Sequence, residues 1–531
     1  MKYELLNKRA WVIVLIFIVF VGLMIQYPYM NEFPSFIHAW SQADRYSIAI
    51  GFINNDLDLF HPETLIYNKQ FPHRWDYAFD NTITSVDFPI LEYIVAIIMK
   101  ITGITSPWIF RTCTLLVALL GMFFLYRLSF LITKDWVKSM FVTMIAMTSP
   151  VYAYYFNGFI PGIPALTFAI IALYCYVKYL NNNKIKTFCF SLLFITLSVL
   201  TRMSFAVVWV ALLGFEFLRI LRKETTFLDK LLPVVISIVV FLSYYLWNKH
   251  LAAENGTLFL GELLPANDWA GFWDMMNAAK ENWQYHYFGK IHYRLFLIIL
   301  VSSISYLIYK KIRFKNVENA QDKKSLSLWI FTAIVLFGYV LFTIAMAKQF
   351  PHHDYYFIDT YFLPLLLLFI LILNVLPKIE SYKSGIISFI ITTIFVVMMI
   401  TNVNEMQKNR RTIDKGRESE RTIRNYQGSE QYLDSLGISK DAKILSLWSY
   451  PQNTPFILMN RKGFTEMWYE KEIIDAGMLF DYDYVIIENE VYEYENEKNA
   501  WRYVFEQLEY YSDNGKIMIF IKKDNGNVNK N

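Results

Sequence analysis

The chain has 531 residues, and 55% of them are hydrophobic while only 18% carry a charge, so the composition excludes an ordinary soluble domain. The formal net charge of +4 is too small for this length to indicate a nucleic-acid partner. The three cysteines, Cys113, Cys175 and Cys189, lie inside apolar runs, so they predict neither a disulfide framework nor a metal site.

Long apolar runs dominate the chain up to residue 401. A span needs about 20 mostly apolar residues, so the runs predict a polytopic α-helical membrane protein with about 11 transmembrane helices. The first run is too long for a signal-peptide core and lacks a small-residue cleavage site, so we expect it to remain as an anchor. The runs lie at residues 11–30, 107–131, 137–154, 161–180, 187–200, 204–220, 231–246, 295–309, 325–347, 358–376 and 385–401.

Lysine and arginine cluster in alternate loops between these runs, which predicts the orientation of the chain. With eleven spans, all the basic loops fall on one side, which the positive-inside rule makes cytoplasmic. We therefore expect an inner-membrane protein with a cytoplasmic N-terminus and an outer tail. The basic loops lie around residues 2–9, 127–138, 178–186, 219–230, 310–324 and 378–383.

The first outer loop, residues 31–106, contains two short helical patterns. Apolar residues recur at spacings of three and four from Trp40 to Ile53, with Asp44 and Arg45 off this stripe. Pro89 begins a second apolar piece that is too short to cross a bilayer. We expect two interfacial helices that form a floor beside the opening of the bundle.

Asp44 is the carboxylate of this loop that is best placed to take part in a reaction. It ends the run Trp-Ser-Gln-Ala-Asp at residues 40–44, a few residues past the first span. A carboxylate in this place is either a solvated surface charge or a base for a reaction at the membrane face. The adjacent Arg45 can pair with a carboxylate and keep the base ionised, although the sequence does not show which carboxylate.

Two further stretches add polar residues to this region. Residues 87–92 read Asp-Phe-Pro-Ile-Leu-Glu, and Arg111 stands at the head of the second span. We expect Asp87 to shape the site, by binding the acceptor or by orienting Arg45 or Arg111, and we include Glu92 with them as substrate-binding residues. The alternative is that these are solvated charges on an interface helix that a proline begins.

Arg202 lies between two apolar runs, directly after Leu200 and Thr201. A lone arginine at a helix centre costs about 2.5–3.5 kcal/mol on insertion scales, and less near the interface. It therefore either extends to the lipid headgroups or binds an anionic group of a substrate.

Residues 348–356 hold a second polar cluster on the expected outer side. Lys348, His352, His353 and Tyr355 supply positive charge and hydrogen-bond donors. The two histidines and the following aspartate could also bind a metal ion, but adjacent residues on one turn rarely supply a whole coordination shell. We predict no metal site and no cofactor.

The tail, residues 402–531, has a different character from the rest of the chain. Residues 408–436 are polar and helix-prone, and β-type runs occur at 442–448, 484–488 and 516–522 with helical stretches at 454–460 and 497–510. This order predicts a small α/β domain with a largely parallel sheet. No glycine-rich phosphate loop follows any of the strands, so we expect no nucleotide site.

Together these motifs resemble the C-type superfamily of membrane glycosyltransferases, near the family-39-like branch of protein O-mannosyltransferases and the lipid A aminoarabinose transferase. The resemblance covers most of the chain, and the first-loop pattern is its most specific part. The family's commoner glutamate is Asp87 here. The matching segments are residues 40–44, 87–91, 200–202, 352–356 and Asn-Arg-Lys-Gly at 460–463.

The resemblance implies an enzyme that transfers a hexose or pentose, with inversion, from a polyprenyl-phosphate donor to an acceptor at the outer face. It makes Asp44 the catalytic base, because the family's catalytic aspartate follows the first span. The leaving lipid phosphate then needs cations, for which Arg202, Lys348, His352 and His353 are the candidates, with Tyr355 as a donor. The domains implied are residues 1–401, whose first outer loop carries the site, and residues 402–531. Lipid A, a polysaccharide, a cell-wall glycan and a protein hydroxyl all remain open as acceptors.

The alternative function is a polytopic transporter or flippase of a glycolipid. Such a protein predicts polar residues along a mid-bilayer path and two mirrored halves. In this chain the charged residues crowd one face and the halves do not mirror each other, so the sequence favours the enzyme.

Overall fold

The computed structural model describes residues 2–313, 320–377, 382–412 and 414–523. The chain divides into two compact units, each built from stretches that are far apart in the sequence. Unit 1 consists of Met1–Met30, Arg111–Tyr245 and Glu262–Lys408. Unit 2 consists of Asn31–Phe110, Leu246–Gly261 and Asn409–Asn531.

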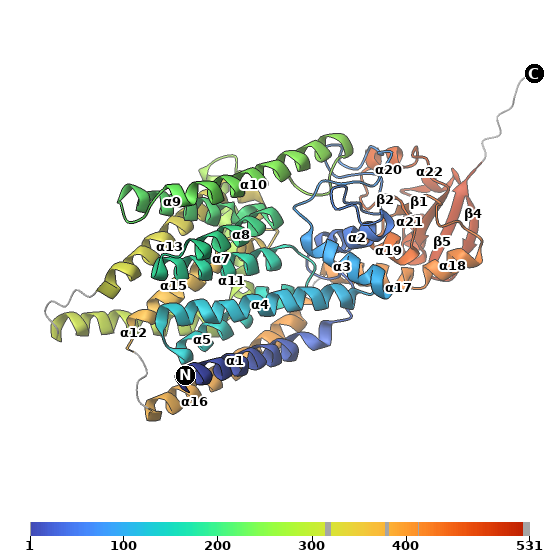
Figure 1. Ribbon diagram of the computed structural model, residues 1–531. Helices are drawn as coiled ribbons and strands as arrows, with labels where there is room; N and C mark the ends of the chain where they lie inside the picture. Colours follow the sequence, from blue (N-terminus) through green and yellow to red (C-terminus); the bar gives the residue numbers. More distant parts are fainter. Residues whose placement is uncertain (1, 314–319, 378–381, 413, 524–531) are drawn as a thin grey trace, which may run out of the picture. The chain divides into compact units, whose positions relative to one another are not determined.

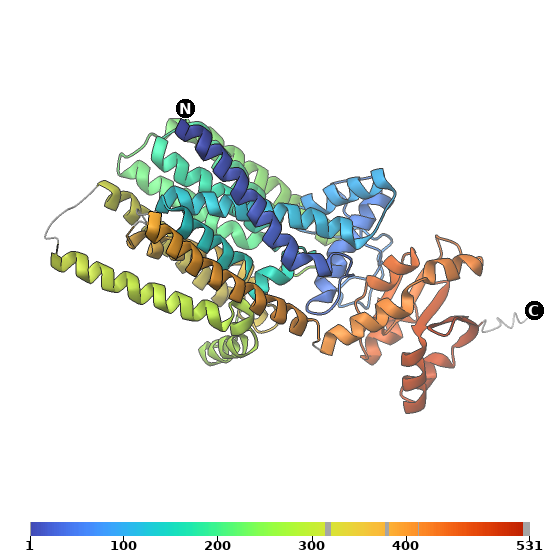
Figure 2. The ribbon, with the colours of Figure 1, turned by 90° about the horizontal axis from the view of Figure 1, so that it is seen from below.

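Unit 1 is a bundle of helices that run side by side (Figures 1 and 2). Among the described residues, seven helices are long and apolar enough to cross a membrane. These are α1 (Lys2–Gln26), α4 (Pro107–Thr133), α7 (Gly162–Asn182), α9 (Ala206–Leu221), α10 (Leu228–Asn255), α12 (Lys290–Arg313) and α13 (Ala320–Ala345). Three shorter apolar helices are α5 (Trp136–Met147), α8 (Ile185–Thr201) and α15 (Phe362–Val375).

The remaining helices of unit 1 are α6 (Pro150–Tyr155), α11 (Trp269–Tyr287), α14 (Tyr356–Asp359), α16 (Tyr382–Arg410) and the 3₁₀ turns η1 (Tyr27–Tyr29), η2 (Met203–Phe205) and η3 (Ala347–Gln349). All eleven predicted runs therefore lie in helical segments, while the number of spans stays a prediction. Parts of two basic loops, residues 314–319 and 378–381, lie outside the described residues.

Two of the predicted runs are each interrupted. The run 137–154 is split because α5 ends at Met147 and α6 begins with Pro150. A proline lacks the backbone N–H that would continue a helix, but it fits the first turn of a new one. The run 358–376 is split at Thr360, where the backbone leaves the helical conformation between α14 and α15.

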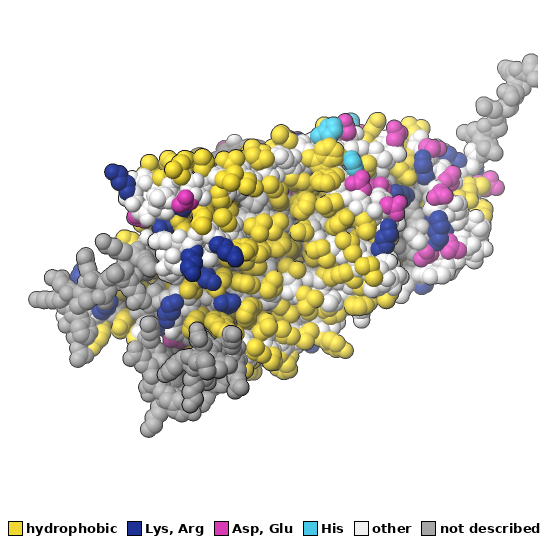
Figure 3. Space-filling view, in the orientation of Figure 1, with side chains coloured by type: hydrophobic (Ala, Val, Ile, Leu, Met, Phe, Trp, Pro, Cys, Tyr) yellow, Lys and Arg dark blue, Asp and Glu magenta, His cyan; other side chains and the backbone are white. Residues whose placement is uncertain are grey.

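The bundle is held by polar contacts between apolar helices as well as by packing. Ser198 on α8 donates a hydrogen bond to the carbonyl of Ala165 on α7 at 2.7 Å, and Ser191 donates to that of Ala172 at 2.9 Å. Such contacts between small residues are typical of helix pairs in membranes. Hydrophobic side chains cover much of the visible face of these helices, and lysine and arginine gather toward the end that holds the N-terminus (Figure 3). Unit 1 is thus membrane-embedded.

Unit 2 combines the first outer loop with the tail. Its helices are α2 (Ala39–Asn54), α3 (Ile90–Thr102), α17 (Asp414–Tyr426), α18 (Ser429–Ser435), α19 (Thr454–Met459), α20 (Lys471–Gly477), α21 (Asn489–Lys498) and α22 (Arg502–Phe505). The two helices expected in the first outer loop are present as α2 and α3, and they pack through Ile48, Phe52 and Ala96. Asp44 and Arg45, expected off the apolar stripe of α2, are in fact buried with 1% and 3% exposure.

The tail contains a five-stranded mixed sheet of order β2-β1-β3-β5-β4. The strands are β1 (Ile444–Leu447), β2 (Gly463–Glu466), β3 (Tyr484–Glu488), β4 (Leu508–Asp513) and β5 (Ile517–Lys522). The pairs β1–β2 and β1–β3 are parallel, whereas β5 is antiparallel to β3 and β4. The sheet is therefore only half parallel, and β2 and β4 were not predicted.

The first outer loop pairs with β2, which is an edge strand of this sheet. The N–H of Tyr67 donates to the carbonyl of Gly463 at 2.9 Å, and the N–H of Gly463 donates to the carbonyl of Leu65 at 3.0 Å. Residue 463 must be glycine, because a Cβ there would lie 1.8 Å from the carbonyl oxygen of Ile444. Pairing with the loop satisfies the edge strand, which explains why such distant segments form one unit.

Candidate active site

The carboxyl group of Asp44 lies in a buried ring of hydrogen-bond donors within unit 2. Gln452 Nε2 donates to Asp44 Oδ1 at 2.7 Å, and Asn453 Nδ2 donates to the same oxygen at 2.8 Å. The Trp40 side chain, one helical turn before Asp44, also lowers the pKa of this carboxyl group. Groups that only donate hydrogen bonds to Asp44 favour its carboxylate form over the protonated acid.

Burial acts against these donors. Removing the group from water raises the pKa of Asp44 to about 8, although the hydrogen bonds and the charge of Arg45 lower it. A general base is most effective when its pKa lies near the working pH. The environment of Asp44 therefore suits a group that exchanges a proton near neutral pH.

Gln452 and Asn453 were missed by the sequence analysis. They follow β1 at the carboxyl edge of the parallel strands, where α/β folds usually hold ligands, and this position was the available signal. Their contact with Asp44 spans more than 400 residues of sequence, and no local pattern predicts it. The Asn453 amide is fixed in orientation, because its Oδ1 accepts from the N–H of Leu65 at 3.3 Å.

Arg45 joins the two acids that the sequence placed in the same loop. Its guanidinium lies 3.3 Å from Asp87 Oδ2 and 3.2 Å from Glu92 Oε1. It also lies over the Phe259 ring, 4.5 Å from the centroid. Burial raises the pKa of Glu92, while the adjacent Arg45 lowers it. The structure thus brings together Asp44, Arg45, Asp87 and Glu92 in unit 2.

Arg111, predicted with this group, belongs to unit 1. Its guanidinium donates to the carbonyl and to the side-chain oxygen of Asn157 at 3.3 and 3.2 Å. It also faces the Phe159 ring at 4.8 Å. These contacts fix the head of the second span against residues that follow α6.

Arg202 lies in unit 1 at the break between α8 and η2. Its Nε donates to Asp359 Oδ2 at 2.6 Å, and its guanidinium lies 5.6 Å from the ring centroids of Tyr355 and Tyr356. The sequence presented Arg202 as a lone cation, whereas the structure shows it in an ion pair. Asp359, which sequence reasoning missed, is fully buried and orients this arginine.

Among the other predicted phosphate-binding residues, Tyr355 faces the Arg202 guanidinium, whereas Lys348 and His353 have other partners. Lys348 Nζ donates to Asn267 Oδ1 at 3.0 Å. The His353 ring packs against the rings of Tyr355 and Tyr356, and His352 is exposed. Across the described ranges, no group of three or more His, Cys, Asp or Glu side chains is arranged to hold a metal ion.

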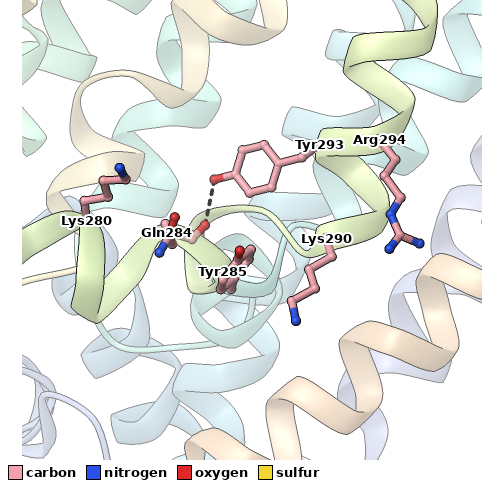
Figure 4. A pocket seen from close by; sticks show the side chains of 6 residues that line it. All are labelled: Lys280, Gln284, Tyr285, Lys290, Tyr293 and Arg294. Atoms are coloured by element: carbon pink, nitrogen blue, oxygen red, sulfur yellow. Dashed lines mark hydrogen bonds between the residues drawn. The ribbon is translucent and has the colours of Figure 1, made fainter.

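A separate recess of about 560 Å³ lies in unit 1 between the end of α11 and the start of α12 (Figure 4). Three of its lining side chains are cationic, none is acidic, and none was predicted as a site residue. Lys290 and Arg294 point the same way, whereas Lys280 lies on the far side of Tyr285, so the three charges do not converge. The lining residues are Lys280, Gln284, Tyr285, Lys290, Tyr293 and Arg294.

The chain is similar to known membrane enzymes. Residues 87–247 match the model of the family described as dolichyl-phosphate-mannose-protein mannosyltransferase. A search of the curated proteins found no significant match.

Solved structures extend the likeness to nearly the whole chain. The archaeal oligosaccharyltransferase AglB from Archaeoglobus fulgidus, in complex with an inhibitory peptide and a dolichol-phosphate, is 12% identical with a TM-score of 0.51. That alignment covers 98% of this chain and 75% of AglB. A second structure of the Archaeoglobus fulgidus oligosaccharyltransferase, with Zn and sulfate, gives 12% identity, a TM-score of 0.51 and coverages of 96% and 73%.

ArnT from Cupriavidus metallidurans in the apo state is 9% identical over 97% of this chain and 98% of its own, with a TM-score of 0.47. The AglB likeness and the family match agree with the resemblance seen in the sequence motifs. The chain therefore has the polytopic fold of the C-type superfamily of membrane glycosyltransferases.

Proposed function

We propose that this protein is an inverting glycosyltransferase that moves a sugar from a polyprenyl-phosphate donor to an envelope acceptor at the outer face of the membrane. The observation that carries the proposal is the buried Asp44 carboxyl, which is surrounded by donors and has a pKa of about 8. The family match at residues 87–247 supports it, as does the fold shared with AglB, which was solved with a dolichol-phosphate.

Asp44 acts as the base in this reaction. The acceptor hydroxyl gives its proton to the Asp44 carboxylate while the hydroxyl oxygen bonds to the anomeric carbon of the donor sugar. The bond from that carbon to the phosphate oxygen breaks on the opposite face, and its electron pair leaves with the polyprenyl phosphate. Gln452 and Asn453 hold the carboxylate in one orientation, which fixes the direction of proton transfer.

We assign Arg45, Asp87, Glu92 and Arg111 to substrate binding. Arg45, Asp87 and Glu92 together carry a net negative charge when both acids are ionised, because one guanidinium pairs with two carboxylates. Such a group suits the hydroxyl groups of a sugar better than a phosphate, because hydroxyls donate to carboxylates.

The leaving phosphate gains negative charge as the bond breaks, so it needs positive partners. We assign this role to residues of unit 1, where Asp359 already orients the guanidinium of Arg202. When no sugar donor is bound, the Asp359 carboxylate offsets the free-energy cost of burying the Arg202 charge. The assigned residues are Arg202, Lys348, His352, His353 and Tyr355.

The placement in the cell follows from charge and function together. We assign residues 1–401 to a transmembrane domain of the inner membrane with its N-terminus in the cytoplasm, and residues 402–531 to an extracytoplasmic α/β domain. The support is the clustering of lysine and arginine in alternate loops.

The test is sugar transfer from a radiolabelled polyprenyl-phosphate sugar by the purified protein and its Asp44→Asn variant. We expect the variant to lose at least about a hundredfold in kcat, because an amide cannot accept the proton. Asp56→Asn is the matched control, since Asp56 is a carboxylate on the same loop whose side chain is 99% exposed. Wild-type turnover by Asp44→Asn would remove this residue from the mechanism.

A further inference from the structure

Three tryptophans from separate parts of unit 2 meet beside Asp44, and we call Trp40, Trp75 and Trp468 the tryptophan cluster. The Trp40 ring lies 5.9 Å from the Trp75 ring and 5.9 Å from the Trp468 ring, measured between centroids. Trp75 is only 3% exposed, so it supports Trp40 from behind, whereas Trp468 is 41% exposed. The cluster thus exposes aromatic surface at Trp468, while Trp75 beneath it is buried.

The positions of Trp75 and Trp468 are coupled through one buried amide. Asn68 Nδ2 donates to the carbonyl of Trp75 at 3.1 Å and to that of Thr465 at 2.8 Å, while Asn68 Oδ1 accepts from the N–H of Thr465 at 3.0 Å. Asn68 is fully buried. Because Thr465 lies on β2 three residues before Trp468, this amide links the loop to the strand that leads into the exposed tryptophan.

The backbone at Trp75 is strained. Trp75 has a φ of 78° and the preceding Arg74 a φ of 48°, in the left-handed region that non-glycine residues seldom occupy. Such strain persists mainly where the surrounding structure imposes it, often at ligand sites. Here the strain places the Trp75 indole against Trp40.

The cluster is connected directly to the base. Trp40 lies one helical turn before Asp44 on α2, so the two side chains extend from the same face of the helix and a molecule that touches Trp40 also lies close to Asp44. In the described part of the chain, Gln452 Oε1 is buried and has no hydrogen-bond partner, although Gln452 Nε2 contacts Asp44. A buried acceptor without a donor is costly, so a hydroxyl that reaches it gains free energy.

We propose that the tryptophan cluster is the acceptor subsite and that the acceptor is a carbohydrate. This inference rests on the proposed function. A sugar ring carries apolar C–H faces and polar hydroxyl edges, so a face can pack on the indoles of Trp40 and Trp468 while an edge meets Gln452 Oε1 and Asp44.

A peptide acceptor fits the surroundings less well. Extended peptides often bind by adding to the open edge of a sheet, and β2 is an edge strand. The main chain of Gly463 and Thr465 on that edge is already bonded to residues 65–68, so it has no groups to offer. A phosphorylated acceptor is disfavoured too, because the exposed cation next to Trp75, Arg74, is already paired with Glu470 at 4.0 Å.

The test compares acceptor kinetics of the purified full-length protein and its Trp468→Ala variant. Labelled neutral oligosaccharides, a serine- and threonine-rich peptide and phospholipid vesicles serve as acceptor probes, with a fixed polyprenyl-phosphate sugar as donor. We expect transfer to an oligosaccharide, with KM raised roughly tenfold in Trp468→Ala and largely restored in Trp468→Phe. Trp273→Ala is the matched control, since Trp273 is 61% exposed and belongs to unit 1.

The same variants separate binding from folding. Oligosaccharide should quench the tryptophan fluorescence of the wild type and of Trp273→Ala but not that of Trp468→Ala, while thermal unfolding stays unchanged because Trp468 is half exposed. Transfer to the peptide or the vesicles alone, or an unchanged oligosaccharide KM in Trp468→Ala, overturns the inference and leaves the proposed function standing. Absence of donor cleavage by the wild type with every probe overturns the proposed function instead.

Discussion

At Asp44, burial and hydrogen bonding act on one carboxyl group in opposite directions. Burial raises its pKa to about 8, while Asn453, Arg45, Trp40 and Gln452 all lower it. A carboxyl without these partners would stay protonated far above neutral pH, and an exposed one would be too weak a base. The pKa of Asp44 therefore lies close to neutral pH, so a small change in its surroundings changes its charge.

This balance predicts a linked effect of pH on stability and activity. The folded-state pKa of Asp44 is above its ordinary value of 3.8, so the folded protein binds more protons than the unfolded chain between about pH 4 and pH 8. The stabilising contribution is complete below pH 4 and is lost as pH rises through about 8. Activity should rise over the same upper range, because only the carboxylate accepts a proton.

The measurement is thermal unfolding of the wild type and Asp44→Asn in detergent from pH 5 to pH 9. We expect the variant to unfold at a higher temperature than the wild type at pH 9, and the difference to shrink toward pH 5. Glu92, whose pKa is also raised by burial, is present in both proteins and cancels in this difference. A difference that is constant with pH would contradict the assigned protonation change.

At the scale of elements, the sequence predicted structure best where the local pattern was complete. The helix expected at 454–460 is α19, and the strand expected at 484–488 is β3 with the same bounds. The strand β2 has four residues and begins with glycine, so it is too short to show an alternation of apolar and polar residues. Its strand conformation depends on pairing with Ile444 and with the first outer loop, which no local propensity reports.

The helix expected at 497–510 was wrong at residues 508–510, which begin a strand, for a similar reason. Its residues form α22 and then β4, and β4 pairs only with β5, which follows it in the chain. Tyrosine favours strand over helix, and the pairing of Tyr510 with Phe520 on β5 fixes the strand there. Elements whose conformation is set by a partner were thus the ones that sequence reasoning missed.

The close approach at Gly463 gives a test of how β2 supports the site. Gly463→Val places a side chain where a Cβ would lie 1.8 Å from the carbonyl oxygen of Ile444, so β1 and β2 must separate. We expect a loss of several kcal/mol in the stability of unit 2 and faster hydrogen exchange in β1, because a clash with backbone cannot relax through a rotamer.

Gly261→Ala is the control for this substitution. Gly261 also belongs to unit 2, and an added Cβ meets nothing within 4 Å. We expect its exchange pattern and its unfolding temperature to match those of the wild type. Equal protection of β1 in Gly463→Val would show that the β1–β2 spacing does not depend on the glycine.

At the scale of the whole molecule, the tail takes part in building the candidate site. Unit 2 is formed by the first outer loop together with residues 409–531, and the contacts between them include both amides at Asp44. The sequence placed Asp44, Arg45, Asp87 and Glu92 in one loop, because they are close along the chain. It could not find Gln452 and Asn453, whose partner is more than 400 residues away.

Asn453 is a residue of the tail whose contribution to the site can be removed by a single substitution. Asn453→Leu removes the donor to Asp44 Oδ1 and the acceptor of the Leu65 N–H while keeping the side chain close in size. The hydrogen bond from Asn453 lowers the pKa of Asp44, so its loss should move the rising limb of the pH–activity profile to higher pH. We expect kcat at pH 7 to fall roughly tenfold or more, with recovery as the pH is raised. Gln507→Leu changes an exposed amide of the same tail and should leave the profile in place. A uniform loss of activity at every pH in Asn453→Leu would indicate a structural role alone, because only a change in the proton affinity of Asp44 displaces the limb.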